Sequence, residues 1–148
     1  MPNSILDPRS RAGLLARIDQ LDPATPARWG RFTAPRMVSH LIESVRMALG
    51  ELPVRRRRSI LGNRLVRALV IHVLPFPRGA PTAGELLARA PASWASDIAT
   101  LKTLIDRAAA HPPHGVWQPH PVFGILSDDD WGVLIYRHTA HHLSQFGA

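Results

Sequence analysis

The chain has 148 residues, a length typical of one domain that can bury a hydrophobic core. Its 45% hydrophobic and 20% charged residues are those of an ordinary globular protein, and the absence of cysteine excludes disulfides, thiolate nucleophiles and thiolate metal ligands. The net charge of +7 comes almost entirely from arginine, because Lys102 is the only lysine.

The arginines are scattered along the chain except for a run at positions 55–58. No aromatic residue lies within that run, as a base-stacking surface would require, so we expect a solvated surface and no nucleic-acid partner. An amphipathic segment next to the run leaves contact with an anionic membrane surface as a further hypothesis. We expect no signal peptide, no transmembrane segment and a cytoplasmic location, which the lack of cysteine fits.

The first part of the chain contains two helix-start signals. Asp7 followed by Pro8 is typical of an N-cap with proline at the first helical position, and residues 22–23 (Asp-Pro) are expected to end that helix. Thr33 is expected to cap a second helix, which ends where Gly50 can adopt a positive φ. Apolar residues recur at helical spacing in both segments, which predicts that each helix buries one face.

The middle of the chain is predicted to contain two more helices and a short helical turn. A third helix is expected over about 56–73, because Pro75 and Pro77 cannot both continue it. A single turn is expected at 85–89. A fourth, long helix is expected over 91–110, with apolar residues at the spacing of a bundle seam.

Residues 111–126 are predicted to form a long ordered loop, and Ser127 is expected to cap the last helix. The three aspartates at 128–130 suit the positive end of its dipole. No stretch shows the sustained alternation of a strand, so no sheet is expected. We therefore predict an all-α protein with a single domain over residues 1–148, a helical bundle with long ordered loops and an extra short helix.

Two histidines continue the core face of the last helix. Trp131 and Ile135 mark that face, and the same spacing leads to His138, His142 and then Gln145. Imidazoles four residues apart lie one turn above the other, which lets both rings direct a nitrogen at one metal ion. Either histidine could instead form a hydrogen bond with a backbone carbonyl, an alternative that the spacing alone leaves open.

A third ligand is expected from another helix, because two ligands are too few for a tight site. His40 is the best candidate, since it is the only histidine within the predicted second helix and lies at the edge of its apolar face. Three neutral imidazoles in an apolar core would leave coordination positions open, as catalytic sites do. Such ligands accept zinc, nickel, iron or manganese, so the sequence does not choose among these divalent ions.

His141 and Gln145 are candidates for supporting the ligands or for acid–base chemistry. His141 is rotated about the helix axis by about 100° from His142 and about 60° from His138. We therefore expect it to support a ligand or to face solvent. Gln145 is the next polar residue on the face that carries the two histidines.

Two residues outside the last helix are further candidates for support or acid–base chemistry. His120 could reach the mouth of the site as a fourth ligand, an acid or a base, or it could hold its loop in place by hydrogen bonds. Glu43 lies one turn after His40 and could orient a ligand or act as a base, although surface exposure is the expected state.

Several motifs resemble one known superfamily. The run HTAHHLSQFG at 138–147 resembles the closing motif of the DinB/YfiT-like superfamily, and MVSHL at 37–41 resembles its second-helix ligand motif. The segments LPFP at 74–77 with APT at 80–82, and HPVFGILS at 120–127 with the Trp-Gly that follows at 131–132, are similar to a branch of that superfamily without an assigned function. These segments are spread over about 29–148, which is most of the chain.

The resemblance implies a DinB-like bundle of four helices in up-down-down-up order, with His40, His138 and His142 holding a divalent metal ion. It also implies a class of chemistry, because relatives include thiol-dependent S-transferases and isomerases. Thr139 stands where many members have an acidic residue after the first C-terminal histidine, and residues 143–144 (Leu-Ser) stand where many have Arg-Gly. These departures concern the substrate and the catalysis rather than the ligands.

Two functions follow as hypotheses. The first is a metal-dependent enzyme, a thiol-dependent transferase or a hydrolase, that acts on a small-molecule substrate. Arg36, Arg46 or Arg137 would form a basic rim that receives a substrate carboxylate. The alternative is a non-catalytic binding or dimerisation module, since bundles of this size commonly form homodimers through exposed apolar faces.

Overall fold

A computed structural model describes residues 2–148, and this part of the chain contains five α-helices, two short 3₁₀ helices and no strand. The predicted all-α class is therefore confirmed. The elements in chain order are α1 (Pro8–Asp19), α2 (Ala34–Ala48), η1 (Ile60–Gly62), α3 (Arg64–His72), η2 (Gly84–Leu87), α4 (Trp94–Ala109) and α5 (Asp128–Gln145). No helix within the described residues is long and apolar enough to cross a membrane.

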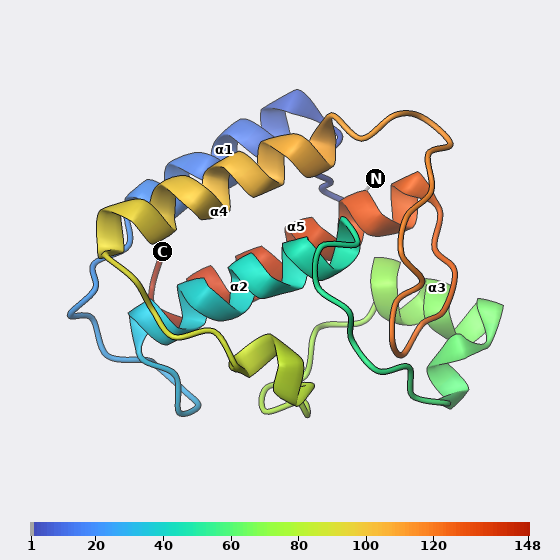
Figure 1. Cartoon of the computed structure of the whole chain (residues 1–148), viewed down its shortest axis with the longest axis horizontal. Helices are drawn as coiled ribbons and strands as arrows, with labels where there is room; N and C mark the ends of the chain where they lie inside the picture. Colours follow the sequence, from blue (N-terminus) through green and yellow to red (C-terminus); the bar gives the residue numbers. More distant parts are fainter. Residues whose placement is uncertain (1) are drawn as a thin grey trace.

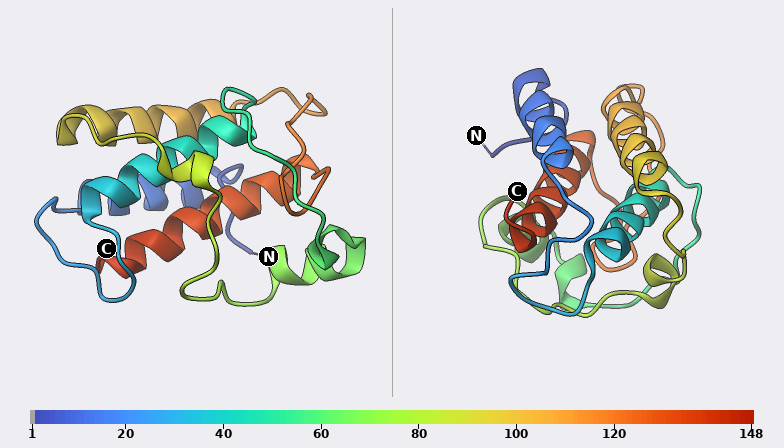
Figure 2. Two further views of the ribbon diagram at one scale, coloured as in Figure 1. Left: turned by 60° about the horizontal axis from the view of Figure 1, so that its bottom comes forward. Right: turned by 90° about the vertical axis from the view of Figure 1, so that its left-hand side faces the viewer.

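The four longest helices lie side by side, and α3 lies at one end of the molecule against α5 (Figure 1). Seen from the end, they form a rough square in which α1 is next to α4 and α5, and α2 is next to the same two helices (Figure 2). The core fills the space between them. It includes two or more buried apolar side chains from each of these four helices, among them Leu14, Ile18, Met37, Leu41, Leu101, Ile105, Trp131 and Ile135.

The helix starts follow the capping residues. The side chains of Asp7, Thr33 and Ser127 each accept a hydrogen bond from a backbone N–H in the first turn, so the three predicted caps are confirmed. Ser127 and Asp130 form a reciprocal capping box, which satisfies two backbone N–H groups that have no partner inside the helix. Gly50 adopts a φ of +78° directly after α2, as expected for a helix C-terminus.

The third helix is shorter than the sequence predicted. Residues 56–59 are not helical, and α3 begins only at Arg64. The reason is local, because the Asn63 side chain accepts hydrogen bonds from the N–H groups of Leu65 and Val66 at 3.0 and 3.4 Å. Ser59 caps the preceding 3₁₀ turn in the same way. Such side chains stop a helix from extending towards the N-terminus.

Two other predicted boundaries also differ. The fourth helix begins at Trp94 rather than at position 91, because the side chain of Ser93 caps it. The N–H of Ala92 is bound instead by the carboxylate of Asp97, at 2.8 Å. The helical turn predicted at 85–89 is the 3₁₀ helix η2 at 84–87.

An ion pair between the partly exposed Arg89 and the buried Asp97 holds the segment after η2 against the helices. Arg89 donates to the Asp97 carboxylate on α4 at 2.6 Å and to the Ser39 hydroxyl on α2 at 2.9 Å. Asp97 is almost completely buried, and with the bond from Ala92 both of its oxygens are satisfied. The network therefore fixes the position of η2 relative to α2, where the candidate site lies.

Replacing Asp97 by alanine should lower the free energy of unfolding by about 2–3 kcal/mol, because it leaves Arg89 and a backbone N–H without their acceptor. Asp106→Ala, also on α4, is the matched control. That carboxylate pairs with Arg11 at a side-chain exposure of 57% and should contribute less than about 1 kcal/mol. Urea denaturation of both variants measures the difference, and equal losses would contradict the network's importance.

Candidate metal centre

Three imidazole rings meet where α2 and α5 face each other. His40 comes from α2, and His138 and His142 come from successive turns of α5; one ring nitrogen of each lies within 4.8 Å of the other two. The Nε2 atoms of His40 and His138 are 3.1 Å apart. The three ring centroids are separated by 4.9–5.0 Å. The structure thus brings together the three histidines that the sequence predicted as ligands.

Hydrogen bonds to the Nδ1 atoms of two of the rings determine which ring nitrogen keeps its lone pair. The Nδ1–H of His40 donates to the backbone carbonyl of Leu86 in η2, at 3.3 Å. The Nδ1–H of His142 donates to Oε1 of Gln145 at 2.8 Å, and the amide nitrogen of Gln145 donates to the carbonyl of Trp29 at 2.7 Å. In both rings Nε2 keeps its lone pair, which is the form that binds a metal.

Burial keeps these histidines neutral. It lowers the pKa of His40 below the ordinary 6.5 and lowers the pKa of His142 to about 4. The pKa of His138 lies well below 6.5, because of burial and then because of the neighbouring His142 and His40. At pH 7 all three imidazoles are therefore uncharged and able to donate a lone pair.

The donor set fits a divalent ion of the first transition row. Two imidazole nitrogens bound to one zinc ion at about 2.0–2.1 Å lie about 3.0–3.4 Å apart, depending on the coordination geometry. The 3.1 Å between His40 and His138 falls in this range. Without a metal, the Nε2–H of His138 can donate to the Nε2 lone pair of His40 at the same distance, so the spacing fits both a shared ion and a hydrogen bond between the two rings.

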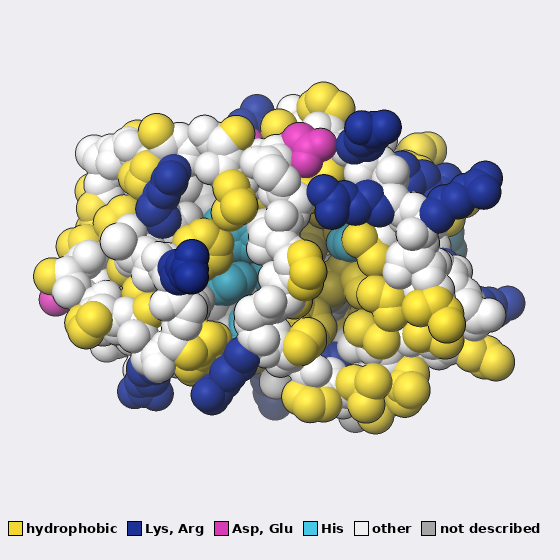
Figure 3. Space-filling view, turned by 90° about the horizontal axis from the view of Figure 1, so that it is seen from below, with side chains coloured by type: hydrophobic (Ala, Val, Ile, Leu, Met, Phe, Trp, Pro, Cys, Tyr) yellow, Lys and Arg dark blue, Asp and Glu magenta, His cyan; other side chains and the backbone are white. Residues whose placement is uncertain are grey.

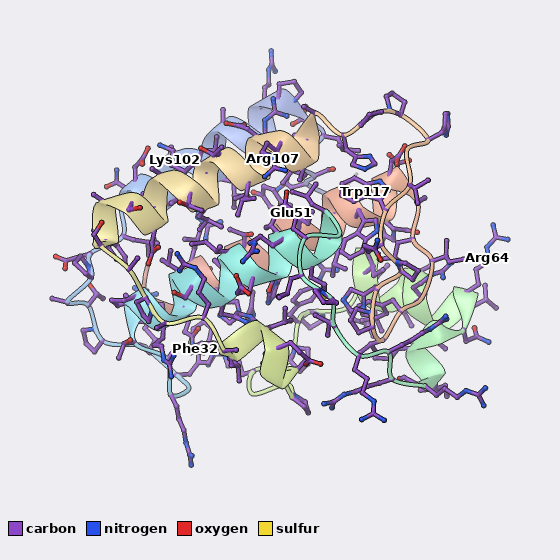
Figure 4. All side chains as sticks on the ribbon, viewed as in Figure 1. Phe32, Glu51, Arg64, Lys102, Arg107 and Trp117 are labelled. Atoms are coloured by element: carbon purple, nitrogen blue, oxygen red, sulfur yellow. The ribbon has the colours of Figure 1, made fainter. Side chains whose placement is uncertain are left out.

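The cluster forms part of the wall of a cavity of about 610 Å³, a volume that suits a small-molecule ligand. Histidine side chains are visible within the hollowed face in Figure 3. Phe32, in the loop before α2 (Figure 4), stacks on His40 with ring centroids 5.3 Å apart. Phe76 lies 6.4 Å from His138. Most of the remaining wall is apolar.

His141 lines the same cavity but is not one of the three clustered histidines. Its half-buried ring makes edge contacts with Trp29 at 5.7 Å and with His142 at 5.3 Å. Burial, and then the charge of Arg78, lowers its pKa. Arg78 in turn lies over the Trp29 ring, 4.1 Å from its centroid. His141 therefore supports the wall of the cavity through packing.

His120 lines the cavity and holds its own loop. Its Nδ1 accepts hydrogen bonds from the N–H groups of Val122 and Phe123, both at 3.1 Å, and its backbone pairs with Gly124. Burial lowers its pKa to about 4. It is not a member of the histidine cluster, so of the two predicted alternatives the structure supports loop stabilisation.

The expected surface exposure of Glu43 was wrong, and the three arginines of the predicted basic rim are not among the residues that line the cavity. Glu43 is only 4% exposed, and its carboxylate accepts from Arg46 at 2.8 Å, away from the residues that line the cavity. Arg137 donates to backbone carbonyls at the end of α3, including that of Val70 at 3.2 Å, and Arg36 is not a lining residue. The side chains of Arg46 and Arg137 are thus engaged in intramolecular contacts, and the basic rim stays a prediction.

Several residues of the site carry no signal in the sequence that marks them as part of it. Phe32 and Arg57 contact the cluster or line the cavity from loops, and Leu86 does so from the 3₁₀ helix η2. Helical periodicity carries no information about such residues. Phe76 had a signal, since it belongs to the LPFP segment at 74–77 that contributed to the family resemblance.

Comparisons with known proteins give one match. Neither the curated proteins nor the solved structures contain a significant match to this chain. A family model described as "Protein of unknown function (DUF1569)" matches residues 6–148, which include every element of the site. The chain therefore belongs to the DUF1569 family.

Proposed function

We propose that this protein binds one divalent metal ion through His40, His138 and His142 and acts as a metal-dependent enzyme on a small, largely apolar molecule. The observation that carries the proposal is the meeting of three neutral imidazoles at the wall of an apolar cavity. Closed structural sites use four protein ligands, whereas three ligands leave a position open for a reacting molecule.

A bound ion would supply Lewis-acid chemistry, which lowers the pKa of a water or thiol and polarises a carbonyl. The chain's own residues do the positioning. The carbonyl of Leu86 and the amide of Gln145 hold two imidazoles in the required tautomer and orientation. Phe32 and Phe76 cover the rings and keep the neighbourhood apolar, which strengthens electrostatic interactions at the site.

We further propose that the bundle is DinB-like and that its reaction class is a thiol-dependent transfer, with hydrolysis as the second option. The support is that one candidate ligand comes from α2 and two come from the last helix, as the motif resemblance implies. Thr139 stands where many members of the superfamily have an acidic residue, and it is buried. Because of this difference, experiment has to identify the substrate class.

Metal content tests the ligand assignment. Untagged wild-type protein should contain about one equivalent of zinc, nickel, iron or manganese by elemental analysis, and His138→Ala should lose at least about 90% of it, because two imidazoles hold an ion weakly. His114→Asn is the control, because that exposed histidine has a positive φ, which asparagine tolerates. A metal content unchanged in His138→Ala would refute the site.

Gln145 tests whether orientation of a ligand matters. Gln145→Leu removes the acceptor of the His142 Nδ1–H and should weaken metal affinity about 10–100-fold in a chelator competition assay. Gln145→Glu keeps an acceptor oxygen and should weaken affinity less, although both variants lose the bond to Trp29. Equal affinities for the two variants would show that the hydrogen bond to His142 has no effect.

Activity separates an enzyme from a binding module. Metal-loaded protein, incubated with a low-molecular-weight thiol and an apolar electrophile, or with an apolar ester, should give turnover that chelator and His138→Ala both abolish. Tight metal binding without turnover of either substrate class would instead favour the non-catalytic alternative.

A further inference from the structure

The net charge of the protein is confined to one segment of the chain. Between Glu51 and Glu85 there is no acidic residue, so residues 52–84 carry seven positive charges and the rest of the chain is balanced. The seven arginines of the segment are Arg55, Arg56, Arg57, Arg58, Arg64, Arg67 and Arg78.

The same segment exposes large apolar side chains. Leu65 and Leu69 on α3 and Val73 at its C-cap follow one another at intervals of four and are 81%, 47% and 68% exposed. Ile60 in η1 and Leu74 after α3 are 76% and 42% exposed. Spacing by four places Leu65, Leu69 and Val73 on one face of the helix. We call these five side chains the α3 patch.

Arginines adjoin the α3 patch. The loop 55–58 leads directly into η1, and all four of its arginines are exposed. Arg64 opens α3 and points away from the body of the molecule in Figure 4. Among the ion pairs of residues 2–148, none involves these five arginines. Their charges are therefore available to a partner.

We propose that the α3 patch and its arginines form a docking surface for an anionic lipid membrane. On such a surface aliphatic side chains enter the boundary between headgroups and acyl chains, while guanidinium groups bind lipid phosphates. Figure 3 shows hydrophobic side chains gathered on one side of the face, basic side chains beside them and the hollow with the histidines on the same face. Docking would thus place the apolar cavity next to the lipid.

Other occupants fit less well. A second copy would bring the same excess of seven positive charges against this surface, which opposes pairing. Nucleic acid would satisfy the arginines but would leave Leu65 and Val73 against phosphates, and Phe76, the one aromatic residue of the segment, belongs to the cavity wall. A membrane interface satisfies both the charge and the aliphatic side chains.

Vesicle co-sedimentation tests this proposal with the full chain. Vesicles of phosphatidylcholine with about 30% phosphatidylglycerol should bind the protein at least about tenfold more tightly than phosphatidylcholine alone, and about 0.5 M salt should weaken that binding. Leu65→Ser with Leu69→Ser should reduce binding at least about tenfold, and so should Arg56→Gln with Arg58→Gln. All four side chains are exposed, so the fold should be retained, which circular dichroism can verify.

Two control variants match these changes in chemistry. Val116→Ser alters another exposed apolar side chain, and Arg9→Gln with Arg36→Gln removes the same charge from exposed positions outside the segment. Both should bind within about twofold of wild type. The proposal fails if anionic vesicles are not bound or if the controls lose as much binding as the patch variants. It also fails if the chain forms a dimer that Leu65→Ser dissociates, which would assign the patch to a second copy.

Discussion

Three imidazoles can direct a nitrogen lone pair at one point inside this protein only if each ring is neutral and is held in the right orientation. Burial lowers their pKa values, and it would be costly if the outer nitrogens had no partners. Leu86 and Gln145 supply such partners for two of the rings. The same two hydrogen bonds leave Nε2 free as a lone-pair donor, so one arrangement both stabilises the buried rings and prepares them for a metal.

That arrangement depends on loops as much as on helices. The carbonyl of Leu86 is in place because Arg89 and the buried Asp97 fix the following segment against α2 and α4. Trp29 fixes the amide of Gln145 from the loop before α2. This ion pair, which lies outside the cavity, is thus connected through one 3₁₀ turn to the tautomer of a candidate metal ligand.

Residues 52–84 combine two properties that are separate in most of the chain. Their inner side chains, among them Val70 and Phe76, line the cavity, and their outer side chains form the α3 patch with its arginines. Arg137 and the hydrogen bond between His72 Nε2 and the Asp130 carboxylate attach α3 to α5, the helix that carries two of the histidines. Docking of a partner on the outer surface of this segment would therefore involve the same structural element as chemistry in the cavity.

Features that depend on neighbours along the chain are predictable from the sequence alone. Capping residues and proline placed most helix ends, and a helical repeat of about 3.6 residues placed His138 and His142 on one face. One predicted helix boundary, the start of α3, is wrong by more than three residues. The cause is Asn63, whose side chain competes with the helix for backbone N–H groups. Other features appear only in the tertiary structure: Glu43 is buried, Phe32 covers His40, and the carbonyl of Leu86 sets the tautomer of His40. Those contacts join residues distant in the chain or depend on how helices pack, and local periodicity carries no record of either.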